Sequence, residues 1–84
     1  MGGYVNEVTL LGYLGSDPEP RGFGNGGRVV AFSVATAEAW RDRASGEPRE
    51  RTQWHRVAVF AEGLAEVAEK HLRKGGRVLV RGQL

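Results

Sequence analysis

Aromatic residues and arginines are concentrated in one stretch of the chain, from Trp40 to Phe60. Within it, Trp54, Arg56 and Phe60 recur at the two-residue spacing that places side chains on one face of a β-strand. A strand that served only the fold would bury its aromatics and expose its arginine. Rings and a guanidinium on the same face instead suit a flat, anionic ligand, because nucleobases stack on the rings and phosphates pair with arginine.

The opposite face of this strand has the composition of a hydrophobic core. Val57 and Val59 share it with His55, which has no second metal ligand or nucleophile accompanying it. The aromatic face is then either open to a ligand or covered by another segment or subunit, since exposed aromatics are also common in protein interfaces. From these residues alone, both interpretations stay open.

The segment between the two tryptophans, from Arg41 to Arg51, contains no large apolar residue. Its Ser45-Gly46 pair and Pro48 favour turns, because glycine accepts a positive φ and proline fixes φ. We therefore predict two strands that meet in a long, charged and flexible hairpin.

Composition limits the classes of protein to which the chain can belong. Its 84 residues suit one small domain, which buries only roughly 60–65% of its unfolded surface. The absence of cysteine excludes disulfides and thiolate metal sites, and fits a reducing compartment. The formal net charge is only +2, so a nucleic-acid binder would need its arginines arranged locally. We expect neither a membrane span nor a signal peptide, because no run has the required apolar length.

The patterning predicts a mainly β domain with one helix. We predict strands over Asn6–Leu14, from Arg28–Thr36 on to Trp40, over Thr52–Phe60 and over Arg77–Leu84, with a helix over Gly63–Lys74. A helix between the third and fourth strands is the order of the OB fold, a five-stranded Greek-key barrel. The fifth strand of a complete barrel is missing from this chain, so we expect one OB-fold domain over residues 1–84 that is truncated or naturally short.

Apolar side chains at strand and helix spacing define the expected core. The inward set comprises Val8, Leu10, Leu14, Val30, Phe32, Val34, Val57, Val59, Val78 and Val80, with the helix stripe Leu64, Val67, Ala68 and Leu72. The outward residues of the second strand are mostly small, which leaves room for a flat ligand or for another backbone. Leu11 and Tyr13 make the outward face of the first strand partly apolar, which suggests burial on both sides or contact with a partner strand.

Glycines and prolines mark the turns. Gly12 in mid-strand predicts a bulge or sharp bend, and Pro18 and Pro20 predict a loop because they cannot donate ladder hydrogen bonds. The glycine-rich segment around Asn25-Gly26 predicts a hairpin tip. A phosphate-cradling loop is disfavoured there, because neither a strand-loop-helix context nor a lysine follows.

Several fragments, taken in order, are similar to the bacterial-type single-stranded DNA-binding protein (SSB) family. They are Val5-Asn6, Gly12-Tyr13-Leu14-Gly15-Ser16-Asp17-Pro18-Glu19, Phe32-Ser33-Val34-Ala35-Thr36, Trp54-His55-Arg56-Val57 and Leu72-Arg73-Lys74-Gly75. Each fragment alone is weak, but together they span the chain at the spacing of that family, which is also a standard example of sequence-tolerant binding to single strands.

The resemblance implies functional residues and an assembly. Trp40, Trp54 and Phe60 would be the base-stacking aromatics, in a homotetramer (a dimer of dimers) around which the strand wraps. Asn6 and Leu10 would lie near a dimer interface and His55 at a subunit contact. Candidates for the DNA backbone are Arg41, Arg43, Arg49, Arg51, Arg56, Arg73 and Lys74.

Some positions depart from the family pattern. Glu7 stands where a basic residue is common, Tyr13 where a small polar residue is common, and Ala61-Glu62-Gly63 replaces a shorter segment that usually carries a lysine. The chain ends at Leu84, before the fifth strand and the acidic-tipped tail that recruits replication and repair proteins in the family. We therefore expect no tail-mediated partners.

The hypothesis that follows is a non-enzymatic protein that binds and protects single-stranded DNA in replication, recombination and repair, in the cytoplasm at the nucleoid. The alternatives are an OB-like protein-interaction subunit and a single-stranded RNA binder. We expect no cofactor and no metal, because the sequence shows neither a ligand cluster nor paired carboxylates in a recognisable motif.

Overall fold

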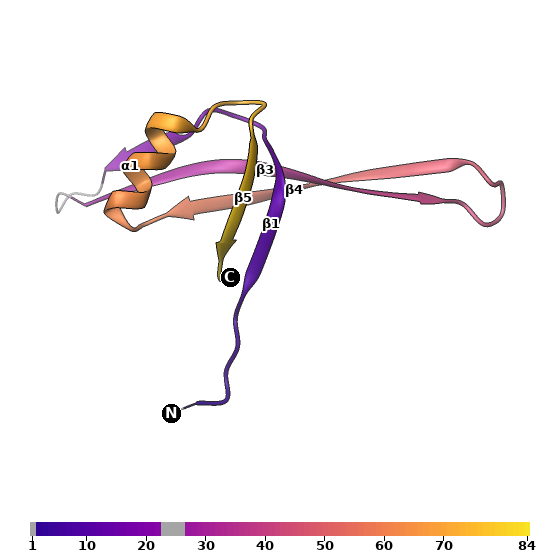
Figure 1. The fold of residues 1–84 in the computed structure, drawn as a ribbon, viewed down its shortest axis with the longest axis horizontal. Helices are drawn as coiled ribbons and strands as arrows, with labels where there is room; N and C mark the ends of the chain where they lie inside the picture. The colour runs from indigo at the N-terminus through magenta and orange to yellow at the C-terminus, as the bar shows by residue number, and fades with distance from the viewer. Residues whose placement is uncertain (1, 23–26) are drawn as a thin grey trace.

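A computed structural model of the chain describes residues 2–22 and 27–84 (Figure 1). The elements are β1 (Val8–Leu14), β2 (Glu19–Gly22), β3 (Arg28–Arg41), β4 (Pro48–Val59), α1 (Glu62–His71) and β5 (Arg77–Gly82). The mainly β architecture and the position of the single helix among these residues confirm the predicted fold class. The predicted turn at Asn25-Gly26 lies outside the described residues.

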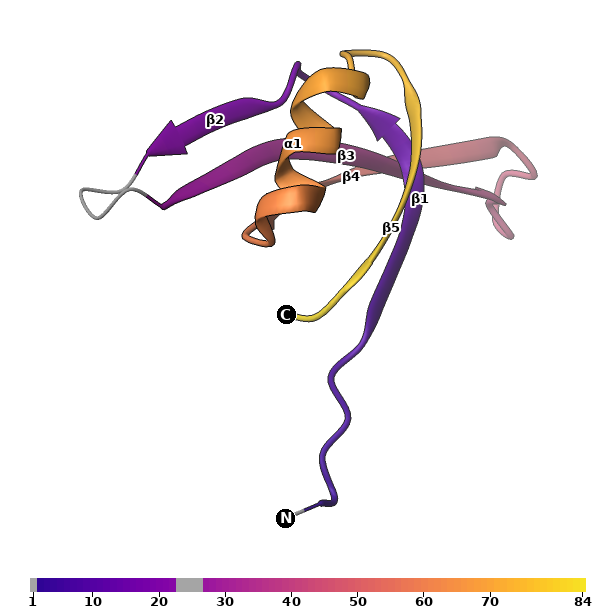
Figure 2. The ribbon, with the colours of Figure 1, turned by 60° about the vertical axis from the view of Figure 1, so that its left-hand side comes forward.

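All strand pairs are antiparallel, and the strand order is β2-β3-β1-β5, with β4 on β3. β1 and β5 run side by side and cross the β3–β4 ribbon steeply (Figures 1 and 2). No helix in the described part of the chain has the length and apolarity that a bilayer crossing requires.

The β3–β4 pair is much longer than the body of the domain. It keeps one register from Val30↔Val59 to Arg41↔Pro48, and its far half projects away from the other elements (Figure 1). We call this projection, residues 37–52, the hairpin arm. The Cα radius of gyration is 16.4 Å, against roughly 12 Å for a compact chain of this length, so the arm makes the molecule elongated.

The long, charged hairpin that the sequence predicts is present, but its strands extend further than predicted and meet in a short turn. Strand pairing continues to Arg41 and Pro48, which leaves only residues 42–47 as the connection. The Asp42 carboxylate accepts the backbone N–H of Ala44 at 2.8 Å, and the Asp42 carbonyl accepts the N–H of Gly46 at 2.7 Å. Gly46 has φ of 73°, a conformation that glycine adopts without strain.

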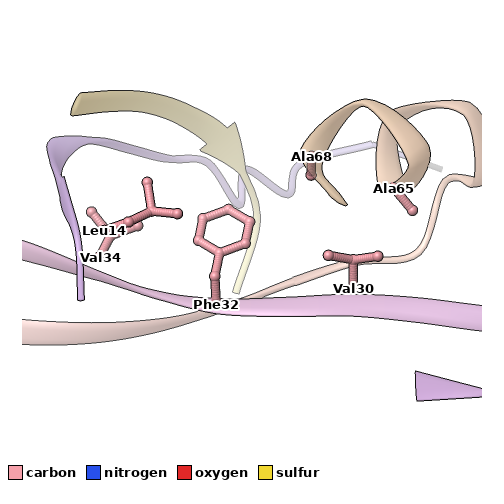
Figure 3. Close-up of a cluster of buried hydrophobic side chains, with 6 residues drawn as sticks. All are labelled: Leu14, Val30, Phe32, Val34, Ala65 and Ala68. Carbon is pink, nitrogen blue, oxygen red and sulfur yellow. The ribbon is translucent and has the colours of Figure 1, made fainter. Parts of the chain in front are cut away.

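The core is a single cluster on the inner side of β3 (Figure 3). Val30, Phe32 and Val34 are buried there, as their alternation predicts, and Leu14 from β1 packs on the same cluster. Val57, Val59, Val78 and Val80, together with Leu72, pack against it while partly buried. The predicted inward faces of all four strands are therefore confirmed.

The face on which α1 packs agrees with the prediction only in part, because Ala68 and Leu72 of the predicted stripe pack on the core. Ala65 and Ala68 are its buried residues, whereas Leu64 and Val67 of the predicted stripe are 62% and 52% exposed. Figure 3 shows Ala65 and Ala68 on the side of α1 that faces β3, where two small side chains let the helix backbone approach the sheet closely. The larger Leu64 and Val67 side chains line the open side of the domain.

That open side is a cavity of about 1090 Å³ between β4, α1 and β5. Val59, Leu64, Val67 and Val80 contribute to its apolar lining. Among the described residues no strand pairs β4 with β5, so the barrel is not closed. The OB order counts the five strands of the barrel without the short β2. Its last strand, which would follow β5, would occupy this gap.

The helix also ends earlier than the sequence predicts. It stops at His71 rather than Lys74, and the guanidinium of Arg73 donates to the carbonyls of Glu69 (2.9 Å) and Leu72 (2.6 Å). The predicted pair of Glu66 and Lys70 is present at 2.9 Å, and this hydrogen bond holds the pKa of the Glu66 carboxyl below its ordinary value. Basic side chains near the last carbonyls stabilise a helix end.

The loop predicted for Pro18 to Pro20 is partly a strand. Glu19–Gly22 forms β2 and pairs with β3, with Pro20 opposite Val30. β2 lies at the edge of the sheet, where a proline can be accommodated because one side of the strand donates no ladder hydrogen bonds. Sequence patterning alone does not show which strand will be at an edge.

Of the bulge or sharp bend predicted at Gly12, the bulge is not present in the pairing of β1 with β5, and the glycine permits a close approach of two strands. The β1–β5 register is continuous from Val8↔Gly82 to Tyr13↔Arg77, so no extra residue is inserted. A Cβ at Gly12 would collide with the backbone carbonyl of Ala35. Glycine is therefore required at the point where β1 passes onto β3.

Candidate nucleic-acid interface

The outer face of β4 presents an aromatic ring and a guanidinium above small side chains. Trp54 pairs with Ala35 and Arg56 pairs with Ser33, and directly paired residues lie on the same face of a sheet. The indole of Trp54 is 63% exposed. The arrangement leaves a ring open to solvent beside a positive charge, with little side-chain bulk on the neighbouring strand.

The indole of Trp54 lies on the backbone of Gly15. Three atoms of its six-membered ring come within contact distance of a Cβ placed at Gly15, with Cη2 at 2.9 Å. The Gly15 N–H donates to the Ser33 carbonyl at 3.0 Å, which holds this glycine beside β3. The indole of Trp54 thus packs on the backbone of Gly15. The residues around Gly15 in the sequence do not predict this contact.

We expect Gly15→Ala to weaken single-strand binding while the domain stays folded. The added methyl cannot fit under the indole, so the ring must tilt or move to another rotamer, at a cost of about 0.5–1.5 kcal/mol. Trp54 emission, followed in titrations of both proteins, checks this. Gly22→Ala is the matched control, because a Cβ at Gly22 meets no atom within 4 Å. Equal affinities for the two variants would contradict a seating role for Gly15.

Phe60 follows the last residue of β4 and is 69% exposed. It continues the alternation of Trp54 and Arg56, but it stands where the chain leaves the sheet toward α1. It also contributes to the rim of the apolar cavity. Phe60 is thus placed to extend the aromatic surface at the end of the domain opposite the hairpin arm.

Trp40 is 47% exposed and lies in the hairpin arm, opposite Arg49. By strand alternation it belongs to the face that carries Val34 and Thr36, not to the face of Trp54. The three predicted stacking residues therefore do not form one flat surface. A ligand that touches Trp40 and Trp54 must pass around the edge of a twisted ribbon.

Four of the predicted backbone-binding residues are already engaged within the chain. The guanidinium of Arg41 donates to the Gly46 carbonyl at 2.7 Å, and that of Arg73 bonds the helix end. Arg49 lies 3.4 Å from the carboxylate of Asp42, and Arg51 lies 3.1 Å from that of Glu38. These exposed pairs are weak, but they offset part of the local positive charge.

The side chains of Arg43, Arg56 and Lys74 form no ion pair or hydrogen bond within residues 2–22 and 27–84. For Lys74 only the backbone N–H is engaged, with the Asp17 carboxylate at 2.7 Å. Of the three, Arg56 is the one that lies beside a candidate stacking ring. It is the best-placed free cation for a phosphate that flanks a base on Trp54.

The predicted interface residues take different positions. The Asn6 side-chain amide donates to the Leu84 carbonyl and accepts the Leu84 N–H, both at 3.0 Å, which extends the β1–β5 pairing. Leu10 is half-buried on the inner side of β1. The His55 ring is half-buried and lies 2.8 Å from the Thr36 hydroxyl across β3 and β4. These contacts lie within one chain.

In the part of the chain that the structure describes, no group of three His, Cys, Asp or Glu side chains is placed to hold a metal ion. What the fold and the site define is an open, OB-type β domain with uncovered rings and a free guanidinium, the class of module that binds single nucleic-acid strands.

Comparison with known proteins identifies the family within this class. A model of the single-strand binding protein family matches residues 5–84. The chain belongs to the single-strand binding protein family.

Two solved structures are similar to the whole domain. One is an SSB from Plasmodium falciparum in complex with single-stranded DNA, with a TM-score of 0.90 and 37% identity over 99% of this chain and 73% of that chain. The other is a deletion mutant of the single-stranded DNA binding protein from Thermus aquaticus, with a TM-score of 0.82 and 31% identity over 95% of this chain. The match covers 38% of the Thermus chain. Both confirm the OB fold.

Proposed function

We propose that this domain binds single-stranded DNA by stacking bases on Trp40, Trp54 and Phe60 while arginines contact the phosphates. Binding of single-stranded DNA is the activity of the family to which the chain belongs. The observation that carries the proposal is the exposed indole of Trp54, seated on Gly15 beside the unpaired guanidinium of Arg56. We extend the proposal to protection of DNA strands in replication, recombination and repair, in the cytoplasm at the nucleoid.

Stacking explains why binding would tolerate any sequence, because every base has a π-face. Each stacked base contributes roughly 1–3 kcal/mol, so three contribute roughly 3–9 kcal/mol before ordering costs. That range corresponds to about millimolar to micromolar affinity for one subunit. Tight binding would therefore require several subunits on one strand.

A homotetramer would supply those subunits, and we include it in the proposal. Asn6, Leu10 and His55 are the residues that we place at or near its interfaces. Light scattering on the full-length gene product would give the mass of the assembly. A stable monomer of the full-length product would contradict this part of the proposal without affecting the stacking residues.

The direct test is tryptophan fluorescence, titrated with a homopyrimidine strand and with a matched duplex. We expect quenching by the single strand and a much weaker response to the duplex, whose bases are already stacked. Equal responses, or none, would refute the stacking mechanism. A competing RNA strand of the same sequence would separate a DNA binder from an RNA binder, and lack of response to either would favour a protein-interaction role.

Removing the charge of Arg56 should reduce the salt dependence of binding more than removing that of Arg51. Each neutralised phosphate contributes about −0.7 to the slope of log affinity against log salt for single strands. Arg56→Gln should make the slope shallower by about that amount, whereas Arg51→Gln should change it less, because Glu38 already offsets the charge of Arg51 at 3.1 Å. Titrations at several salt concentrations measure both slopes. Identical slopes in the two variants would show that the internal ion pair does not decide which arginine serves the strand.

A further inference from the structure

We infer that Asp17 is a positioning residue for DNA binding: its carboxylate holds the turn after α1 so that the Lys74 ammonium stays near the indole of Trp54. The inference rests on the proposed function and deepens it, because Asp17 acts through Lys74 rather than on the strand itself. A base on Trp54 and a phosphate on Lys74 would then be kept at a fixed separation.

The turn between α1 and β5 is tied to the end of β1 (Figures 1 and 2). The Leu14 N–H donates to the Gly76 carbonyl at 2.9 Å, and the Gly75 N–H donates to the Leu14 carbonyl at 2.8 Å. The next residue is Gly15, and the indole of Trp54 packs on its backbone. The turn and the ring therefore lie against the same short segment of the chain.

The position of Lys74 within this turn depends on the Asp17 carboxylate. The Gly76 N–H closes the turn on the Arg73 carbonyl at 2.9 Å, and Gly75 has the positive φ, 84°, that a type II turn requires at its third residue. Such a turn leaves the N–H of its second residue, Lys74, without a partner of its own. The Asp17 carboxylate accepts this N–H at 2.7 Å and so holds the middle of the turn against the loop after β1.

Lys74 supplies a free charge at this place. The neighbouring Arg73 guanidinium is occupied by the last carbonyls of α1, whereas the Lys74 side chain forms no ion pair or hydrogen bond in the part of the chain that the structure describes. A lysine ammonium is a compact charge on a flexible stem, so the region it reaches depends on where its backbone is held. With Arg56 on β4, Lys74 gives the surface around Trp54 a second free cation.

The chemistry of Asp17 also favours positioning over contact with the strand. A carboxylate repels phosphates, so an exposed aspartate near the indole does not suit direct binding. An ion pair between Asp17 and the Lys74 ammonium would offset the lysine charge. The observed bond goes to the backbone N–H instead, which holds the residue in place and leaves its ammonium available to a phosphate.

The test compares Asp17→Ala with Asp17→Asn, because the two variants lose the same charge. The amide oxygen of asparagine can still accept the Lys74 N–H, and alanine cannot. Fluorescence anisotropy with a labelled oligothymidine measures the slope of log affinity against log salt. One phosphate contact contributes about −0.7, a factor of about 2.6 in affinity between about 50 and 200 mM salt. Asp17→Ala should have a slope shallower by up to about 0.7, and Asp17→Asn should retain the original slope.

Lys74→Gln shows whether Asp17 acts through the lysine. Its slope should be shallower by about 0.7. The double variant Asp17→Ala/Lys74→Gln should have the slope of Lys74→Gln alone, because the second change removes a contact that the first has already lost. Arg56→Gln should add its own effect to that of Asp17→Ala, because Arg56 is placed by β4 and not by the turn.

Three results would overturn the role of Asp17: an unchanged slope in Asp17→Ala, an equally shallow slope in Asp17→Asn, or additive effects in the double variant with Lys74→Gln. Urea unfolding followed by circular dichroism establishes that each variant is folded under the titration conditions. If Asp17→Ala does not fold, the carboxylate serves the fold and the positioning role is overturned. An unchanged slope in Lys74→Gln overturns it as well, whether or not Asp17→Ala folds.

Trp54→Ala, measured in parallel, separates this inference from the proposed function. If Trp54→Ala weakens binding while the slopes of the Asp17 and Lys74 variants equal that of the unmodified protein, the inference fails and the proposed function stands. If Trp54→Ala leaves binding unchanged, the proposed function itself fails and the inference fails with it.

Discussion

Replacement of Trp54 by alanine should weaken binding to every single strand alike, by roughly five- to 150-fold for each lost stack. The ring is exposed, so its removal takes little from the core, and the effect should fall on the ligand rather than on the fold. Anisotropy titrations with oligomers of thymidine, of cytidine and of mixed sequence measure the loss. Because stacking uses the π-face that all bases share, the ratio of affinities among the three oligomers should be unchanged.

Two further variants make this result interpretable. Trp54→Phe keeps a ring over Gly15 and should retain most of the affinity. Gln53→Ala alters the adjacent, exposed residue on the other face of β4 and should have no effect. A loss confined to one oligomer would point to hydrogen-bonded base recognition and would contradict stacking. Unaltered binding by Trp54→Ala would remove the central residue of the proposed surface.

Replacement of Gly12 by alanine should destabilise the domain far more than the same change at Gly82, on the neighbouring strand. The new Cβ would collide with the Ala35 carbonyl and would also press on Val34 Cγ1 at 3.0 Å. Backbone atoms cannot move aside like a flexible side chain, so we expect a loss of about 3 kcal/mol. A chain of 84 residues has a total stability of roughly 4–13 kcal/mol, so this loss is a large fraction of it. Urea unfolding followed by circular dichroism measures it.

Gly82→Ala is the internal control for that experiment. Gly82 belongs to the same β1–β5 ladder, opposite Val8, but a Cβ there meets no atom within 4 Å. Alanine should be neutral at Gly82 or stabilising by about 0.4–1 kcal/mol, because it restricts the unfolded chain. Similar unfolding midpoints for the two variants would mean that the crossing of β1 and β3 relaxes easily.

Strand faces were predictable because their signal is local. The alternation of Trp54 and Arg56 with Val57 and Val59 identifies the inner and outer sides of β4 without reference to any other strand, and the structure has the same sides. The same holds for Val30, Phe32 and Val34 on β3. Because side chains alternate along a strand, only two sets of residues can face the core, and the set that contains the valines is the buried one.

The helix face was not predictable in the same way. Leu64, Val67, Ala68 and Leu72 form the predicted apolar stripe, but a stripe centred on Ala65 and Ala68 is just as compatible with burial at a period of 3.6. Which stripe packs depends on how closely the helix backbone must approach β3, a tertiary quantity. The open side of the barrel then left the larger side chains exposed.

The candidate site shows the same division between local and distant information. The types of Trp40, Trp54 and Phe60 single them out in the sequence, and their exposure agrees with a binding role. Trp40 belongs to the other face of the ribbon because the alternation that buries Val34 continues unbroken along β3, and the pairing with β4 places Trp54 on the opposite face. The indole of Trp54 contacts Gly15, which is far from it in the chain. Side-chain periodicity within one strand therefore could not predict this contact.

Backbone amides along the hairpin arm will not be equally protected from exchange with solvent. Near Val30 and Val59 the ladder is backed by the core, whereas beyond Thr36 both strands are exposed. Fraying that begins at the tip and moves inward therefore has a low free energy. A nucleotide bound at Trp40 would have to suppress this fraying. The free-energy cost of ordering the arm would then reduce the observed affinity.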